Sequence, residues 1–211
     1  AASHKEITEA AAAASLNFVI VTDHNIHANG LESYYGRTLL LVGEEIHNVC
    51  RHPSVSHLLV YGTEQEIAPY SFGNPQTLIQ TIQARGGFCY IAHPIDRRSR
   101  LKPDWRSMPW VDWPVQGVVG IELWDYMSEF KGLLRAKLVA ALYARRPEWG
   151  IRGPYKATLR LWDELLRNGQ RLAALGGANA HGPSQKWRLF GHAGLSYEYL
   201  FRCVNTHILT R

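Results

Sequence analysis

Residues 18–25 read Phe-Val-Ile-Val-Thr-Asp-His-Asn, an apolar, largely β-branched run that ends in polar side chains able to bind metals. The run 18–21 predicts a buried strand, and the good helix formers over 5–15 predict a helix before it. Further apolar runs lie at 39–42, 58–61, 88–91, 118–123 and 172–175. Most of them are apolar on both faces, which is typical of parallel strands covered by helices on both sides.

Helices are expected between these strands over 76–85, 132–146 and 155–168, so that helix and strand alternate as in α/β proteins. Helical spacing places Leu138, Leu142, Leu159 and Leu166 among the expected core residues. The stretch 96–114 has neither a helix nor a strand period, and it predicts a long functional loop or lid. Because nothing marks a second domain, we expect one α/β domain over residues 1–211.

Composition narrows the class of protein. With 211 residues, 46% hydrophobic and 19% charged, the chain is not disordered, collagen-like or a coiled coil. No apolar run approaches the ~20 residues of a membrane-spanning helix, so no membrane partner is expected. Three cysteines cannot form a disulfide framework, which favours a reducing, cytoplasmic setting. The formal net charge of +5 favours anionic ligands, but it is too small and scattered to indicate nucleic-acid binding.

Metal-binding side chains follow four of the predicted strands. They are His24, Glu45, His93 and His181, and the chain has ten histidines in all. A single strand-end histidine more often bonds a loop carbonyl, but four such ends favour a shared site, because parallel strands converge at one rim. Imidazole and carboxylate without thiolate indicate zinc, manganese or iron in a catalytic site.

Six segments in order resemble motifs of the PHP (polymerase and histidinol phosphatase) metallohydrolase superfamily, over about residues 5 to 182. They are Thr22-Asp23-His24-Asn25, Gly43-Glu44-Glu45-Ile46, 57–62, 86–94, 120–122 and 176–181. The resemblance implies a distorted seven-stranded, TIM-like β/α barrel with two or three divalent ions at its rim. The family's opening H-x-H segment is missing, and the first residue is not methionine. We therefore expect a barrel that is incomplete at its N-terminus, in a domain truncated at both ends.

The resemblance also implies a ligand set, which comprises His24, Glu45, His57, His93, Asn179 and His181. Strand alternation puts Glu44 and Glu45 on opposite faces, and the family's spacing from Gly43 selects Glu45. His57 fits less well, because it precedes its apolar run where the others follow theirs. Asn179 stands where the family has an aspartate, so weaker metal binding is expected there.

Three further residues are assigned differently. The role of Glu122 stays open, with a structural hydrogen bond as one interpretation. His27 and His47 lie near ligand segments and could reach the rim, but they are interpreted as loop histidines bonded to water or backbone.

The expected reaction is hydrolysis of a small-molecule phosphate ester by metal-activated water. Asp23 or His181 is the expected general acid or base, and Arg97 and Arg98 either bind phosphoryl oxygens or form a solvated basic loop.

Two alternatives stay open. The same ions would serve a carboxylic or carbamate esterase, with Trp105, Trp110 and Trp113 lining an apolar pocket. A degenerate module that binds a partner or nucleic acid is favoured by Asn179 and by the missing first motif.

Overall fold

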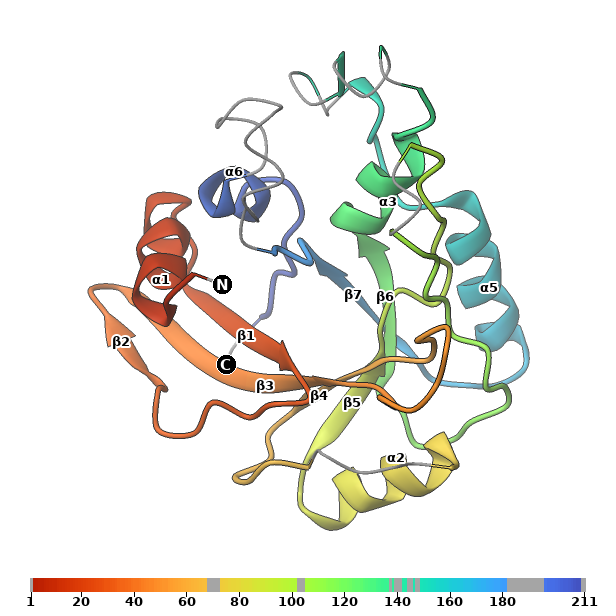
Figure 1. Ribbon diagram of the computed structural model, residues 1–211. Helices are drawn as coiled ribbons and strands as arrows, with labels where there is room; N and C mark the ends of the chain where they lie inside the picture. The colour runs from red at the N-terminus through yellow and green to blue at the C-terminus, as the bar shows by residue number, and fades with distance from the viewer. Residues whose placement is uncertain are drawn as a thin grey trace.

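The computed structural model describes residues 2–67, 73–101, 105–136, 149–181 and 196–209, together with positions 138, 142, 143 and 146 (Figure 1). The helices and strands follow in the order α1 (His4–Ala13), β1 (Phe18–His24), β2 (Ser33–Tyr35), β3 (Thr38–Ile46), β4 (Leu58–Tyr61), α2 (Pro75–Ala84), β5 (Phe88–Ile91), β6 (Gly120–Asp125), α3 (Tyr126–Leu133), α5 (Lys156–Arg167), β7 (Ala173–Gly177) and α6 (Tyr197–Phe201). Each of the six apolar runs noted in the sequence forms a strand. The α/β class is therefore confirmed, but helices and strands alternate only in part, because β1 to β4 follow one another without a helix between them.

The strands form one mixed, seven-stranded sheet in the order β1-β3-β4-β5-β6-β7, with β2 paired to β3. The sheet curls into a half-barrel (Figure 1). Strand β1 is parallel to β3, and β6 is parallel to both β5 and β7. Strand β4 runs antiparallel to both β3 and β5. The expectation of parallel strands is therefore wrong for β4, whereas a curled α/β sheet is compatible with the expected distorted barrel.

Local sequence signals set the helix ends. Helix α1 begins with a capping box in which Ser3 and Glu6 satisfy each other's backbone N–H groups. Helix α2 begins with Asn74 as cap and Pro75 in the first turn. Helix α3 begins at Tyr126, earlier than the helix expected over 132–146, because the Asp125 side chain accepts a hydrogen bond from the Ser128 N–H at 3.0 Å. Helix α3 ends at Leu133, and much of the remaining expected helix lies outside the described residues.

The burial of the helices partly follows the expected pattern. In α5, Leu165 is buried in the core, but Leu159 and Leu166 are 36% and 38% exposed. Leu138 and Leu142 are also exposed, at 87% and 45%. The expectation that these four leucines pack in the core is therefore wrong.

The core falls into separate clusters along the sheet. Helix α2 packs Leu78, Ile79 and Ile82 against strands β4, β5 and β6 in one cluster. Helix α1 covers Val19 and Val21 of β1 in another cluster, which also contains Phe201 of α6. Helix α6 lies between α1 and β7 (Figure 1), so it links the first strand of the half-barrel to the last.

The segment between β5 and β6 is irregular in its described parts, as expected, but it is packed rather than open. Trp110 is 3% exposed and belongs to the core beside α2. Trp105 packs against the cluster around α3, and Trp113 packs beside Trp110. These tryptophans therefore stabilise the loop on the sheet. Among the described residues, no helix has the length and apolarity needed to cross a membrane.

Candidate metal centre

One end of the sheet collects the polar side chains noted in the sequence. The register pairs His24 at the end of β1 with Glu45 near the end of β3. Because β4 is antiparallel, its beginning lies at this same end, and Leu58 pairs with both Ile46 and Ile91. His57, just before β4, therefore reaches the same rim as His93, just after β5. The reversed direction of β4 explains why His57 precedes its strand.

Glu45 lies at the centre of the cluster. Its Oε1 accepts hydrogen bonds from His57 Nδ1 at 2.7 Å and from His93 Nε2 at 3.2 Å. Its Oε2 lies 3.9 Å from His24 Nε2. Glu45, His57 and His93 are all buried, whereas the His24 side chain is 42% exposed. The cluster thus has a buried floor and a solvent-facing side at His24.

Glu44 faces the other way, as strand alternation predicts. Its Oε1 accepts a hydrogen bond from the Ile67 N–H at 2.8 Å, and its side chain is fully buried. The prediction that Glu44 and Glu45 lie on opposite faces is confirmed.

Two further histidines complete the ring of imidazoles. His47 stacks on His57 with ring centroids 4.5 Å apart and lies 5.2 Å from the His24 ring. His181 stacks on His24 at 5.8 Å, nearly parallel to it. His47 therefore reaches the rim, and interpreting it as a loop histidine bonded to water or backbone is wrong. The missed signal is its position two residues after Glu45, which puts both side chains on the same face.

Burial and proximity set the protonation of the cluster. Burial opposes ionisation of Glu45, but the hydrogen bonds from His57 and His93 hold the pKa of Glu45 well below its usual range. Burial also lowers the pKa of His57 and of His181. Burial together with the nearby imidazoles lowers the pKa of His47 to about 4. The result is an ionised carboxylate surrounded by mostly neutral imidazoles, the forms that coordinate metals.

His93 differs from the other histidines. Burial alone would lower its pKa, but the hydrogen bond and charge of Glu45, with the nearby Asp125 and Glu122, raise the pKa of His93 to about 10. The proton on His93 Nε2 thus lies between His93 and Glu45, two of the three side chains that could hold a cation.

Two groups of three side chains could each hold a metal ion. One group is Glu45, His57 and His93, and the other is His24, His47 and His57. Within each group the donor atoms lie within 4.8 Å of one another. This nitrogen and oxygen donor set fits zinc, manganese or iron. Both groups use His57, whose Nδ1 faces Glu45 and whose Nε2 faces Ser54 Oγ at 2.9 Å.

Two acidic side chains of strand β6 form hydrogen bonds next to the cluster. Glu122 Oε2 accepts a hydrogen bond from the His93 N–H at 2.9 Å, where His93 has a left-handed φ of +28°. Asp125 Oδ2 accepts a hydrogen bond from Asn179 Nδ2 at 2.8 Å. Burial and the Asp125 charge raise the pKa of Glu122 well above its ordinary value. Glu122 thus makes the structural hydrogen bond that was one interpretation of its role. Asn179 contacts Asp125, which no sequence motif indicates.

The structure does not bring three of the predicted catalytic residues into the cluster. Asp23 pairs in register with Glu44, so both lie on the face of the sheet opposite Glu45. The Asp23 carboxylate lies 3.6 Å from His4 Nε2. The Arg97 guanidinium stacks over the Tyr155 ring at 4.3 Å, and Arg98 is exposed. No described contact joins either arginine to the histidines, so their role in binding phosphate stays a prediction.

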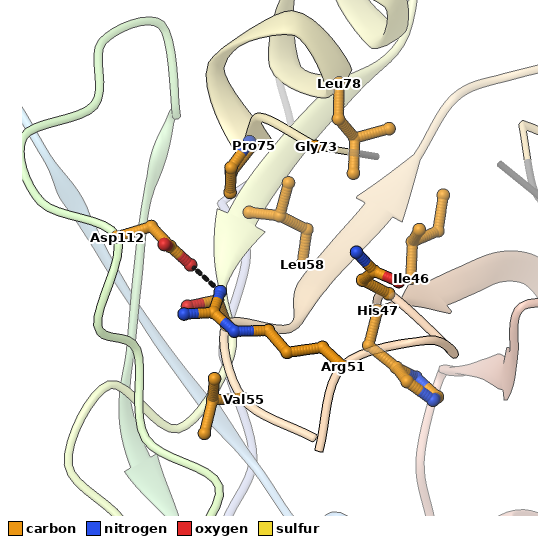
Figure 2. Close-up of a pocket in the computed structure, with 11 residues that line it drawn as sticks. Ile46, His47, Arg51, Val55, Leu58, Gly73, Pro75, Leu78 and Asp112 are labelled. Atoms are coloured by element: carbon orange, nitrogen blue, oxygen red, sulfur yellow. Dashed lines mark hydrogen bonds and ion pairs between the residues drawn. The ribbon is translucent and has the colours of Figure 1, made fainter. Parts of the chain in front are cut away.

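A pocket of about 210 Å³ lies beside the cluster (Figure 2). Its lining includes Ile46 and Leu78 from the α2 side of the sheet, and Arg51 and Asp112 form an ion pair at 2.5 Å beside it. The His47 ring points away from this pocket in Figure 2. The pocket and the cluster are therefore neighbours that share His47, but Glu45, His57 and His93 do not line the pocket. None of the loop tryptophans lines this pocket, so it does not support the esterase alternative.

Comparisons with protein-family models, with curated proteins and with solved structures find no match for this chain. The resemblance to the PHP superfamily therefore stays a prediction.

Proposed function

We propose that this protein binds a divalent metal ion at the Glu45 cluster and acts as a metal-dependent hydrolase, with small-molecule phosphate esters as the first substrate class to test. The observation that carries the metal proposal is one buried carboxylate oxygen that accepts hydrogen bonds from both His57 and His93. Buried polar groups converging on one point, with more imidazoles beside them, are unusual unless they serve a site. The phosphate ester class rests on the motif resemblance and on the net charge of +5.

Glu45, His57 and His93 would hold the ion, with His24 and His47 beside them. When bound, a divalent ion makes hydroxide available from water near neutral pH and stabilises negative charge on phosphoryl oxygens. The ester would approach from the side of His24, because this is the exposed edge of the cluster.

The remaining chemistry is a proton transfer. His181 stacks on His24, and because burial lowers the pKa of His181, its imidazole is neutral and able to accept a proton. His181 would take a proton from the attacking water as the water oxygen bonds to phosphorus. It would return that proton to the alcohol oxygen as the phosphorus–oxygen ester bond breaks.

The test compares Glu45→Gln with Glu44→Gln. Both residues are buried on the same strand, but only Glu45 faces the histidines. We expect wild type and Glu44→Gln to bind zinc or manganese. We expect Glu45→Gln to bind these ions about 100-fold or more weakly, a larger loss than most substitutions of residues that only orient a metal ligand. Metal content is measured by elemental mass spectrometry, and hydrolysis is measured with phosphomonoesters alongside aryl carboxylic esters.

Each arm of this test has a result against the proposal. Equal metal content in wild type and Glu45→Gln contradicts the metal site. Metal-loaded protein that cleaves only the carboxylic esters contradicts the phosphate ester class.

A further inference from the structure

The orientation of His93 depends on a carbonyl in the loop between β5 and β6. His93 Nδ1 lies 2.8 Å from the Met108 carbonyl oxygen, and its Nε2 lies 3.2 Å from Glu45 Oε1. A carbonyl only accepts hydrogen bonds, so Nδ1 carries the hydrogen in this contact. The Nε2 atom is therefore the one directed at the cluster. For a metal-binding histidine, such a bond from the second nitrogen fixes both the ring plane and the tautomer.

Met108 lies in no helix or strand, so its carbonyl is positioned by contacts of the loop itself. On the side after Met108, two backbone hydrogen bonds hold the loop: the Ser56 N–H donates to the Pro109 carbonyl at 3.0 Å, and the Trp110 N–H donates to the Pro94 carbonyl at 3.2 Å.

On the side before Met108, the contacts come from side chains. The Met108 N–H donates to Asp96 Oδ2 at 2.7 Å. The Ser107 hydroxyl donates to the Asp96 carbonyl at 2.6 Å. Asp96 thus binds two consecutive residues of the loop, the second of which presents its carbonyl to His93.

Asp96 is itself held by a buried cation from helix α3. Lys131 Nζ lies 2.5 Å from Asp96 Oδ2 and donates to the Arg106 carbonyl at 3.1 Å. The Asp96 side chain is completely buried, and the Lys131 side chain is 10% exposed. A buried ion pair adds little net stability once its desolvation is counted, whereas removing one partner leaves an uncompensated buried charge.

We propose that Asp96 and Lys131 are positioning residues for His93, because they fix the Met108 carbonyl that orients its imidazole. The chain of contacts runs from Lys131 to Asp96, then through the backbone of Met108 to His93 Nδ1. Its effect on metal affinity rests on the proposed function, whereas its effect on the imidazole does not.

The test uses Lys131→Met and the double variant Asp96→Leu with Lys131→Met. The double variant removes both charges and so avoids leaving one of them buried without a partner. Phe130→Leu is the matched control, since Phe130 is a fully packed neighbour on α3 that has no part in the ion pair. It shows what loosening α3 alone does.

The first measurement is the Nδ1 proton of His93 by ¹H–¹⁵N NMR of the metal-free protein, assigned by its absence in His93→Gln. A buried, hydrogen-bonded imidazole proton exchanges slowly enough to be seen. We expect this proton in wild type and in Phe130→Leu, and we expect its loss by exchange in the double variant. If it persists unchanged in the double variant, the proposal is overturned.

The second measurement is zinc affinity by competition with a chelating dye. We expect the double variant to bind about 10- to 100-fold more weakly than wild type, as for other groups that orient a metal-binding histidine. We expect Phe130→Leu to stay within twofold. A double variant with wild-type affinity also overturns the proposal. If wild type itself binds no zinc, the metal function fails, and the NMR result alone decides whether Asp96 and Lys131 position His93.

Discussion

Replacing Gly43 with alanine tests how closely β3 and β4 must approach beneath the cluster. A Cβ at position 43 would lie 2.5 Å from the Val60 carbonyl oxygen and 2.9 Å from Tyr61 Cδ1. Ordinary contacts begin at about 3.4 Å, so the two strands must separate by about 0.9 Å at this point. Overpacking of this kind costs about 1–3 kcal/mol. For a chain of 211 residues, this lowers the melting temperature by about 2–12 °C.

The same substitution should weaken the cluster, because the 2.7 Å contact between Glu45 and His57 joins these two strands. Urea denaturation gives the free energy of unfolding, and zinc titration gives the affinity. Gly153→Ala is the matched control, since nothing lies within 4 Å of a Cβ there. It should change stability little or raise it by about 0.4–1 kcal/mol. A Gly43→Ala protein as stable as the Gly153→Ala control would refute the steric argument.

Two further predictions concern groups outside the cluster. Burial raises the pKa of Glu129 to about 8 from 4.5, so the folded state keeps a proton that the unfolded state loses, and stability falls as pH rises from about 4.5 to 8. Glu129→Gln should flatten this fall, giving a larger free energy of urea unfolding than wild type at pH 9 and a similar one at pH 4.5; equal pH dependence in both proteins would contradict the assignment. Burial raises the pKa of the Cys89 thiol to about 12, whereas Cys50 is exposed. An aromatic disulfide reagent should therefore modify Cys50 in the native protein and Cys89 only after unfolding, as mass spectrometry of peptides will show.

The direction of β4 shows where prediction of the fold from sequence stopped. The apolar run 58–61 predicts a buried strand, because burial on both faces leaves a continuous hydrophobic pattern. That pattern does not encode direction. An antiparallel strand buried on both faces has the same composition as a parallel one, and the deciding factor is the connection from Ile46 to Leu58, which returns without a crossover helix.

The site was predictable where strand alternation applied. Alternation correctly separates Glu44 from Glu45, and the same rule separates Asp23 from His24 once β1 is known to continue to His24. The apolar run 18–21 gives no sign of that continuation, so the sequence alone does not separate Asp23 from the site. Asp125 follows a bulge between Glu122 and Trp124, and such an irregularity leaves no period in the sequence to read.

The hairpin of β3 and β4 makes half of the cluster a local structure. Glu45 and His57 are twelve positions apart in the chain, whereas Glu45 and His93 are 48 apart. Loop closure entropy rises by ~0.6 kcal/mol per doubling of length, so the second contact costs ~1.2 kcal/mol more to close in an unfolded chain. During folding, the hairpin can therefore bring Glu45 and His57 together first. Strand β5 then delivers His93 to a pair that already exists.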